Sequence, residues 1–429
     1  MRSGDTAFLL ICAALVMFMI PGLAMFYGGM VRAKNVLGTL MQSMFALGIV
    51  SLLWVVAGYT LAFGPDHQGL IGGFGYLGFA GVGQSPNDAL APGVPHIAFA
   101  AFQMMFAAIT PALITGAFAE RIKFPAFVMF TAAWLILVYS PIAHWVWAPG
   151  GWIRELGALD FAGGTVVHIN SGAAAIAAAM VIGKRRDFGT VRIAPHNLTL
   201  TILGAGVLWF GWFGFNAGSA LSAGSLASSA FVATNLGAAG GVCGWAVTEA
   251  LKHRRCTSLG AASGGIAGLV AITPAAGFVD PLAAIAIGLC GGAVCALAIG
   301  VKFSLHLDDS LDVAGVHMTG GVVGAVLTGV FATTAVNSAG TMGLIGGEPS
   351  LILKQLVAVA VVAAFSFFAS FGIFKAIDAL VGLRIAEDDE VAGLDWSQHS
   401  EIGYAFGDAS GRDSGTQTET VAGSLGQPA

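Results

Sequence analysis

Two histidines lie inside long apolar segments of the chain, and each follows an aspartate. His168 ends the run that starts at Asp160, and His317 ends the run that starts at Asp312. Ionisable side chains inside apolar membrane segments are rare and usually mark an ion or substrate pathway. Burial favours the uncharged imidazole, which offers one hydrogen-bond donor and one acceptor. The pattern therefore suits a small polar solute or a proton relay.

The other interpretation is that each histidine is a separate, hydrogen-bonded core side chain. We favour a shared pathway because the two residues hold equivalent places in the internal repeat described below. No Cys, Asp or Glu stands at ligand spacing to either histidine, so we expect no metal and no other cofactor. Asp is a favoured N-cap residue. We expect Asp160 and Asp312 to cap the helices they begin, and binding of a cation is the alternative for Asp160.

Aromatic side chains form a second group of candidates. Phe102 and Phe106 are four residues apart and share a helix face. Trp147 ends the next apolar segment, and Phe215 and Ser219 end a later one. Such residues often only anchor a protein at the membrane interface. In a bundle interior they can hold a cation by cation–π attraction of about 2 kcal/mol or more, with Ser219 as an acceptor.

The composition fits only a membrane protein. Of the 429 residues, 56% are hydrophobic and 10% are charged, and the mean hydropathy is +0.83. A soluble domain has roughly 25% charged residues, so these residues cannot cover a water-facing surface. The 62 glycines suit transmembrane helices that approach each other closely. We expect an all-α polytopic fold.

A membrane-spanning helix needs about 20 mostly apolar residues. Segments of this kind lie at about 6–31, 36–63, 97–119, 124–147, 162–182, 198–217, 228–251, 258–274, 281–303, 312–331 and 350–382. Lys and Arg gather in alternate loops, and Arg154 is the only one in loop 148–161. By the positive-inside rule the N-terminus is outside and the C-terminus cytoplasmic, in the cell inner membrane.

The segments repeat. Ala108–Ile–Thr–Pro–Ala112 recurs as Ala271–Ile–Thr–Pro–Ala275, and Asp160–x–Ala–Gly163 recurs as Asp312–x–Ala–Gly315. Both matches are offset by five segments, an odd number, so the halves must have opposite orientations. Such 5+5 inverted repeats place a transport site at their interface. Residues 1–383 therefore form one membrane domain, with the eleventh segment as one long C-terminal helix.

Residues 384–429 form a polar tail, which we expect to be cytoplasmic and disordered beyond about residue 407. No nucleophile–base set or cofactor motif appears anywhere in the chain, so we expect no enzyme. No nucleic-acid partner is expected, and the lipid bilayer is the surrounding medium.

Four runs of the sequence resemble the ammonium transporter family (Amt/Mep/Rh), on its Amt branch. They are Asp160–Phe–Ala–Gly–Gly–Thr–Val–Val–His168–Ile–Asn, Gly211–Trp–Phe–Gly–Phe–Asn–Ala–Gly–Ser219, Phe26–Tyr–Gly–Gly–Met–Val–Arg–Ala–Lys–Asn35 and Ala119–Glu–Arg–Ile122. The resemblance extends from about residue 5 to residue 404. One departure lies after Trp147, where Ala148–Pro149 stands in place of the Gly run of many relatives.

The resemblance implies a homotrimer with one pore in each protomer, and a tail that binds a PII-type regulatory protein. It also implies roles for individual residues: substrate recruitment by Phe102, Phe106, Trp147 and Ser219, a gate of Phe106 and Phe215, pore histidines His168 and His317, and a structural or electrostatic Asp160. Ammonium would be attracted outside and deprotonated, and ammonia would then pass the histidines, with methylammonium as an analogue. The alternatives are an ammonium sensor of the same fold and a channel for another small neutral solute such as urea or carbon dioxide.

Overall fold

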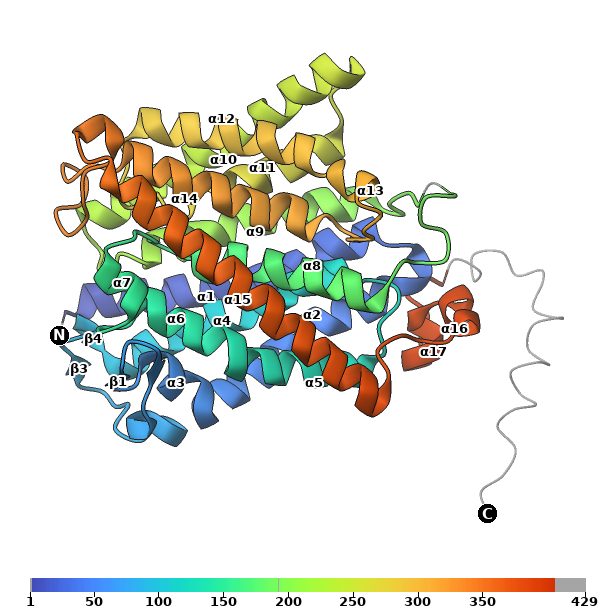
Figure 1. Cartoon of the computed structure of the whole chain (residues 1–429), viewed down its shortest axis with the longest axis horizontal. Helices are drawn as coiled ribbons and strands as arrows, with labels where there is room; N and C mark the ends of the chain where they lie inside the picture. Colours follow the sequence, from blue (N-terminus) through green and yellow to red (C-terminus); the bar gives the residue numbers. More distant parts are fainter. Residues whose placement is uncertain (1, 192, 406–429) are drawn as a thin grey trace.

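Long apolar helices make up most of the molecule (Figure 1). The computed structural model describes residues 2–191 and 193–405, so the disorder expected beyond about residue 407 concerns residues outside this description. Within the described ranges, ten helices are long and apolar enough to cross a membrane. The shorter apolar helix α11 (Ser258–Ile272) brings the number of apolar segments to eleven. The all-α polytopic membrane fold is confirmed.

Lipid offers backbone amides no hydrogen-bond partners, so each apolar segment satisfies its own as a helix. The first five segments are α1 (Ser3–Met30); α2 (Val36–Leu53) continued by a π-helix (Trp54–Gly58) and α3 (Tyr59–Phe63); α4 (His96–Ile114); α5 (Phe124–Trp134) continued by a π-helix (Leu135–Tyr139) and α6 (Ser140–Trp147); and a π-helix (Gly164–Ile169) continued by α8 (Asn170–Ile182).

The second five segments follow the same plan. They are α9 (Leu198–Gly218), α10 (Ser225–His253), α11, α12 (Pro281–Ala298), and a π-helix (Ala314–Met318) continued by α14 (Thr319–Phe331). Short 3₁₀ turns lie at Ala33–Asn35, Phe74–Phe79, Thr115–Ala117 and Leu344–Gly346. The two halves meet where α1 packs against α9. The eleventh segment, α15 (Ser350–Val381), runs diagonally across the bundle and contacts α5, α8 and α14 (Figure 1).

The bundle has two ends, which we call the amino face and the carboxyl face. The amino face carries α7 (Trp152–Leu156) and two antiparallel hairpins, β1 (Asp66–His67) with β2 (Ile71–Gly72) and β3 (Pro86–Asn87) with β4 (Ala91–Pro95). The carboxyl face carries α13 (Val301–Ser304), α16 (Glu387–Ala392) and α17 (Leu394–His399). Figure 1 shows these elements at opposite ends of the long helices.

A buried ionic cluster joins the loops of the carboxyl face. Arg185 pairs with Asp308 at 2.8 Å and with Glu120 at 3.2 Å, and Arg32 pairs with Glu120 at 3.0 Å. Burial alone would raise the pKa of the Glu120 carboxyl, but the two arginines hold it below its usual value. The loops after α1, α4 and α8 are therefore tied to the loop before α14.

The C-terminal segment docks on this face through exchanged helix caps. The Asp395 carboxylate accepts a hydrogen bond from the Gly38 amide at 2.8 Å, at the start of α2. In return, the Asn35 side chain accepts one from the Leu394 amide at 2.8 Å, at the start of α17. The first turn of a helix has unpaired amides that such acceptors satisfy. The docked segment therefore supplies a hydrogen-bond acceptor to the first turn of α2.

Glycines bring α10, α11 and α12 into backbone contact. A Cβ added at Gly241 would lie 2.3 Å from a carbonyl oxygen of α11, and one at Gly268 would lie 2.2 Å from the carbonyl oxygen of Gly237. Added at Gly288 or Gly292, it would lie 2.1 Å from an oxygen of α10. Small residues let membrane helices approach in this way. These three helices form a layer in which the backbones contact each other directly at these four glycines.

Candidate functional site

A cavity of about 170 Å³ opens at the amino face. Its lining includes three of the four residues expected to recruit substrate, namely Phe106, Trp147 and Ser219. Phe102 does not line it: the side chain is fully buried, and its ring packs edge-on against Phe106 with centroids 4.9 Å apart. Phe102 thus lies behind the cavity wall rather than in it.

Among the lining residues that the sequence interpretation missed, two are polar, Gln103 and Arg154. Gln103 lies between Phe99 and Phe106 on one face of α4, and all three line the cavity. The helical spacing i, i+4, i+7 could have indicated that face. Gln103 Oε1 is buried and has no hydrogen-bond partner among the described residues. The cavity therefore offers a free acceptor in addition to the Ser219 hydroxyl.

Trp147 and Ser219 are held by hydrogen bonds from outside the cavity. The Trp147 indole N–H donates to the Asp160 carbonyl oxygen at 3.0 Å. The Ser219 hydroxyl donates to the Phe215 carbonyl oxygen at 2.9 Å, in the last turn of α9. Because its proton is used there, the Ser219 oxygen can accept a hydrogen bond from a molecule in the cavity. Pro149 lies in a turn closed by the Gly151 amide, which donates to the Ala148 oxygen at 3.0 Å.

Two phenylalanine rings close the floor of the cavity. Phe106 and Phe215 stack with centroids 4.1 Å apart and an interplanar angle of 25°. Trp147 meets Phe106 edge-on, with centroids 5.9 Å apart. Phe215 also faces His168 on its other side, at a centroid distance of 6.1 Å. The stacked rings separate the open cavity from the histidines.

The two histidines meet at the centre of the bundle. Their Nδ1 atoms are 3.3 Å apart, and the ring planes differ by 23°. His168 also stacks on Trp212 at 5.4 Å, and the Trp212 indole N–H donates to the Thr273 hydroxyl at 2.9 Å. His168 Nε2 is buried without a partner among the described residues. The rings line a space of about 10 Å³, which is near the lower limit for one water molecule.

Asp160 orients the helix that carries His168. Its carboxylate accepts hydrogen bonds from four consecutive backbone amides, Gly163 to Val166, at 2.7–3.1 Å. These amides begin the π-helix Gly164–Ile169. π-Helical turns place a side chain differently from an α-helix and are frequent at functional sites. The geometry is that of an N-terminal cap.

The expected cap at Asp312 is wrong. Asp309 accepts from the amides of Val313 and Ala314 at 3.0 and 2.8 Å, at the start of the π-helix that carries His317. Asp312 has a left-handed backbone with φ of +60° and pairs instead with Lys302 at 2.6 Å. The Asp312 carboxylate lies against Lys302, while the Asp312 carbonyl oxygen accepts a hydrogen bond from the Val316 amide at 2.9 Å.

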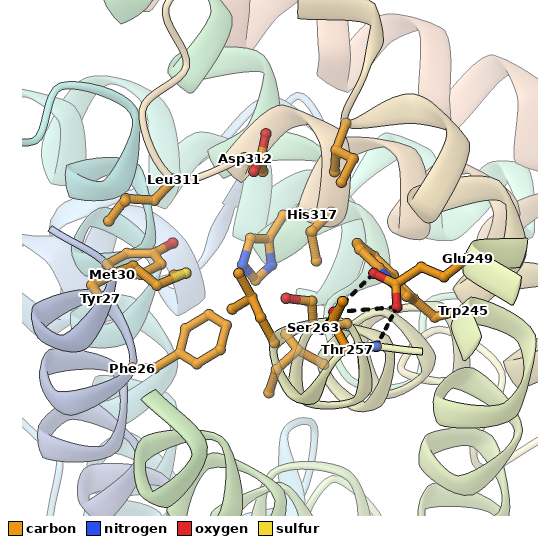
Figure 2. A pocket seen from close by; sticks show the side chains of 15 residues that line it. Phe26, Tyr27, Met30, Trp245, Glu249, Thr257, Ser263, Leu311, Asp312 and His317 are labelled. Carbon is orange, nitrogen blue, oxygen red and sulfur yellow. Dashed lines mark hydrogen bonds between the residues drawn. The ribbon is translucent and has the colours of Figure 1, made fainter. Parts of the chain in front are cut away.

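A third cavity, of about 110 Å³, lies on the carboxyl side of His317 (Figure 2). Tyr27, Ser263 and Asp312 line it, and the His317 ring points into it. Glu249 accepts from the Thr257 amide and hydroxyl and from the Trp245 indole. His317 therefore borders both this cavity and the central space.

No group of three or more His, Cys, Asp or Glu side chains in residues 2–191 and 193–405 could hold a metal ion. An inverted-repeat bundle of eleven apolar helices, with cavities on both sides of its centre, is the architecture of a membrane transport protein.

The comparisons with known proteins identify the family. The chain matches the description Ammonium Transporter Family over residues 7–404. An ammonium transporter of Bacillus subtilis (strain 168) is 53% identical over 405 residues, which cover 94% of this chain and 99% of that protein. The crystal structure of Saccharomyces cerevisiae Mep2 is 36% identical, covers 95% of this chain and 92% of that chain, and has a TM-score of 0.85.

A solved structure named Sensor Amt Protein is 31% identical, with a TM-score of 0.84, and covers 92% of this chain and 98% of that chain. The chain belongs to the ammonium transporter family. It is a multi-pass membrane protein of a transporter family rather than of an enzyme family.

Proposed function

We propose that this chain carries ammonium across the membrane by removing its proton at the amino face and conducting ammonia past His168 and His317. The observation that carries the proposal is the order of the cavities. The open space at the amino face ends at the Phe106–Phe215 stack. Both histidines line the central space beyond it, and His317 also borders the cavity of the carboxyl face.

Recruitment uses the aromatic walls of the amino-face cavity. Phe106 and Trp147 present ring surfaces to a cation, and the Ser219 oxygen replaces part of its hydration shell. Phe102 supports Phe106 from behind. Asp160 acts structurally and electrostatically: its carbonyl holds Trp147, and its carboxylate holds the helix of His168.

Size and charge decide which species passes. Moving an intact ion into hydrocarbon costs tens of kcal/mol by idealised Born solvation. The central space of about 10 Å³ has no room for a hydration shell. Ammonium therefore transfers a proton to water in the amino-face cavity, and the Phe106–Phe215 gate opens to neutral ammonia. The two imidazoles then provide the hydrogen bonds that replace water.

The positive-inside rule orients the molecule. Lys and Arg side chains gather at the carboxyl face, where Arg32, Arg121 and Arg185 are part of the ionic cluster. We place this face in the cytoplasm and the protein in the cell inner membrane. The docked C-terminal segment is then accessible to a cytoplasmic PII-type regulatory protein, and the assembly is a homotrimer.

Ammonium-evoked current and uptake in proteoliposomes test this function. His168→Ala and His317→Ala should each reduce uptake at least tenfold, because either change removes one imidazole from the path. His253→Ala, at the exposed end of α10, is the matched control. Undiminished uptake in both pore variants would overturn the histidine path. A current that persists while ammonium is present would show that the released proton also crosses the membrane. Inhibition of uptake by methylammonium but not by urea would support a cation as the substrate.

A second candidate is an ammonium sensor of the same fold. It is favoured by the 31% identity to the structure named Sensor Amt Protein. A sensor would bind ammonium without useful flux, so saturable binding together with absent uptake in the same liposomes would favour it.

A further inference from the structure

Arg154 lines the amino-face cavity together with Phe106 and Trp147, and the proposed function assigns it no role. It is also the only Lys or Arg of loop 148–161. We infer that Arg154 sets the ammonium affinity of this cavity, because its fixed positive charge weakens cation binding and favours release of the proton. The inference rests on the proposed function.

Short-range contacts fix the position of Arg154. The helix α7 that carries it is anchored by the buried Ile153 and by the Trp152 amide, which donates to the Gly69 oxygen at 3.1 Å. Gly157 then ends the helix in the left-handed conformation, with φ of +84°. The guanidinium Nη1 donates to the Trp147 carbonyl oxygen at 2.6 Å. The guanidinium charge is therefore held beside Trp147, which lines the cavity.

No carboxylate within the described ranges forms an ion pair with Arg154. Glu155 follows it in sequence but does not line the cavity. The Asp160 carboxylate is occupied by four backbone amides. Arginine keeps its charge at any physiological pH. The edge of the cavity is thus positive.

A positive charge near bound ammonium disfavours the ion relative to ammonia. Ammonium then gives its proton to a water molecule of the cavity, which leaves ammonia and a hydronium ion that passes to the solvent. The charge lowers the affinity for the cation and at the same time assists the step that admits ammonia to the central space. An arginine at the mouth of a cation pathway therefore favours turnover over tight binding.

The test compares Arg154→Gln, Arg154→Lys and Lys354→Gln in uptake measurements on proteoliposomes. Lys354 is the matched control, since it lies near Gly157 on the same face but does not line the cavity. A unit charge about 8 Å from a cation, at an effective dielectric of about 40–80, changes affinity roughly two- to sixfold. Arg154→Gln should lower KM by that factor without raising Vmax, whereas Arg154→Lys and Lys354→Gln should keep the wild-type KM.

Ionic strength separates a charge effect from a structural one. The KM difference of Arg154→Gln should shrink between about 0.01 M and about 1 M salt, because the screening length falls from about 30 Å to about 3 Å. A raised KM in both Arg154 variants would mean that the residue only supports Trp147, and an unchanged KM in Arg154→Gln would mean that it has no role. Either result would overturn the inference.

Equilibrium binding keeps the two proposals separate. Ammonium titrations of the detergent-solubilised protein, followed by tryptophan fluorescence, should show tighter binding in Arg154→Gln even if wild-type liposomes show no flux. Absent flux with tighter binding would contradict the proposed function alone. Normal flux with identical binding would contradict the Arg154 inference alone.

Discussion

Asp160 and Asp309 hold equivalent positions in the two halves of the chain, since each lies eight residues before a histidine (160 to 168 and 309 to 317). Both carboxylates accept hydrogen bonds from backbone amides at the start of a π-helical turn. The same local arrangement is thus built twice, in helices that enter from opposite faces. This arrangement brings the Nδ1 atoms of His168 and His317 to within 3.3 Å of each other.

Asp309 should make the stability of the protein depend on pH. Burial raises the pKa of its carboxyl from 3.8 to about 6. Between these values the folded state binds more protons than the unfolded state, so the free energy of unfolding falls as pH rises from about 4 to about 6. In the wild type this fall in the free energy of unfolding should be on the order of 2–3 kcal/mol, and Asp309→Asn should abolish it. Thermal unfolding in detergent at several pH values measures it, and parallel wild-type and variant curves would contradict the prediction.

Gly172 should not tolerate alanine. A Cβ there would lie 2.4 Å from Met318 Cβ and 2.5 Å from the Met318 amide nitrogen. Because Met318 follows His317, the added methyl group should separate the two histidines, destabilise the protein by about 1–3 kcal/mol and reduce uptake. The control is Gly206→Ala in α9, where an added Cβ would meet nothing within 4 Å. Equal uptake by the two variants would argue against this prediction.

Arg121 should not be replaceable by lysine. Its buried guanidinium donates to the carbonyl oxygens of Ala117 and Gly183 at 2.9 and 2.8 Å, and also to Asp308 and Ser310. A lysine cannot reproduce this planar set of donors, and each buried carbonyl left unpaired costs about 1–3 kcal/mol. We expect Arg121→Lys to lose about 2–5 kcal/mol of stability in chemical denaturation.

The matched control for Arg121→Lys is Arg186→Lys. The Arg186 side chain is 53% exposed and pairs with Glu387 at 3.5 Å. Exposed pairs contribute little, so this variant should stay within about 0.5 kcal/mol of wild type. A similar loss in both variants would show that the buried network is not what distinguishes Arg121.

Asp395→Ala should loosen the docked C-terminal segment. The change removes the acceptor at the start of α2, with an expected loss of about 1 kcal/mol. Limited proteolysis should then cut the chain near α16 faster than in wild type. Asp388→Ala, which alters an exposed residue of α16, should leave the cleavage rate unchanged. Equal cleavage rates in all three proteins would mean that the cap does not hold the segment.

Hydropathy and loop charge predicted the eleven apolar segments, because lipid leaves the backbone so few alternatives. The sequence also predicted that His168 and His317 approach from opposite sides. It could not predict which aspartate caps the second π-helix. The match of Asp312 with Asp160 rested on two small neighbours, whereas the left-handed φ of Asp312 and its ion pair with Lys302 are features of the folded loop.

The cavity lining was predicted in part. A spacing of four residues places Phe102 and Phe106 on one side of α4, but a helix side is broad enough to include both a cavity wall and a buried contact. Rotation of α4 about its axis decides between Phe102 and Gln103, and that rotation depends on α9, where Gly218 packs on the Phe102 ring. Arg154 followed no periodic pattern, so only the folded loop reveals its position.

The glycine layer of α10, α11 and α12 limits how this protein can evolve. No amino acid is smaller than glycine, so every amino-acid substitution at Gly241, Gly268 or Gly288 adds a carbon that would lie 2.1–2.3 Å from a carbonyl oxygen. The contact of α10 with α11 and α12 therefore leaves these positions no neutral substitution.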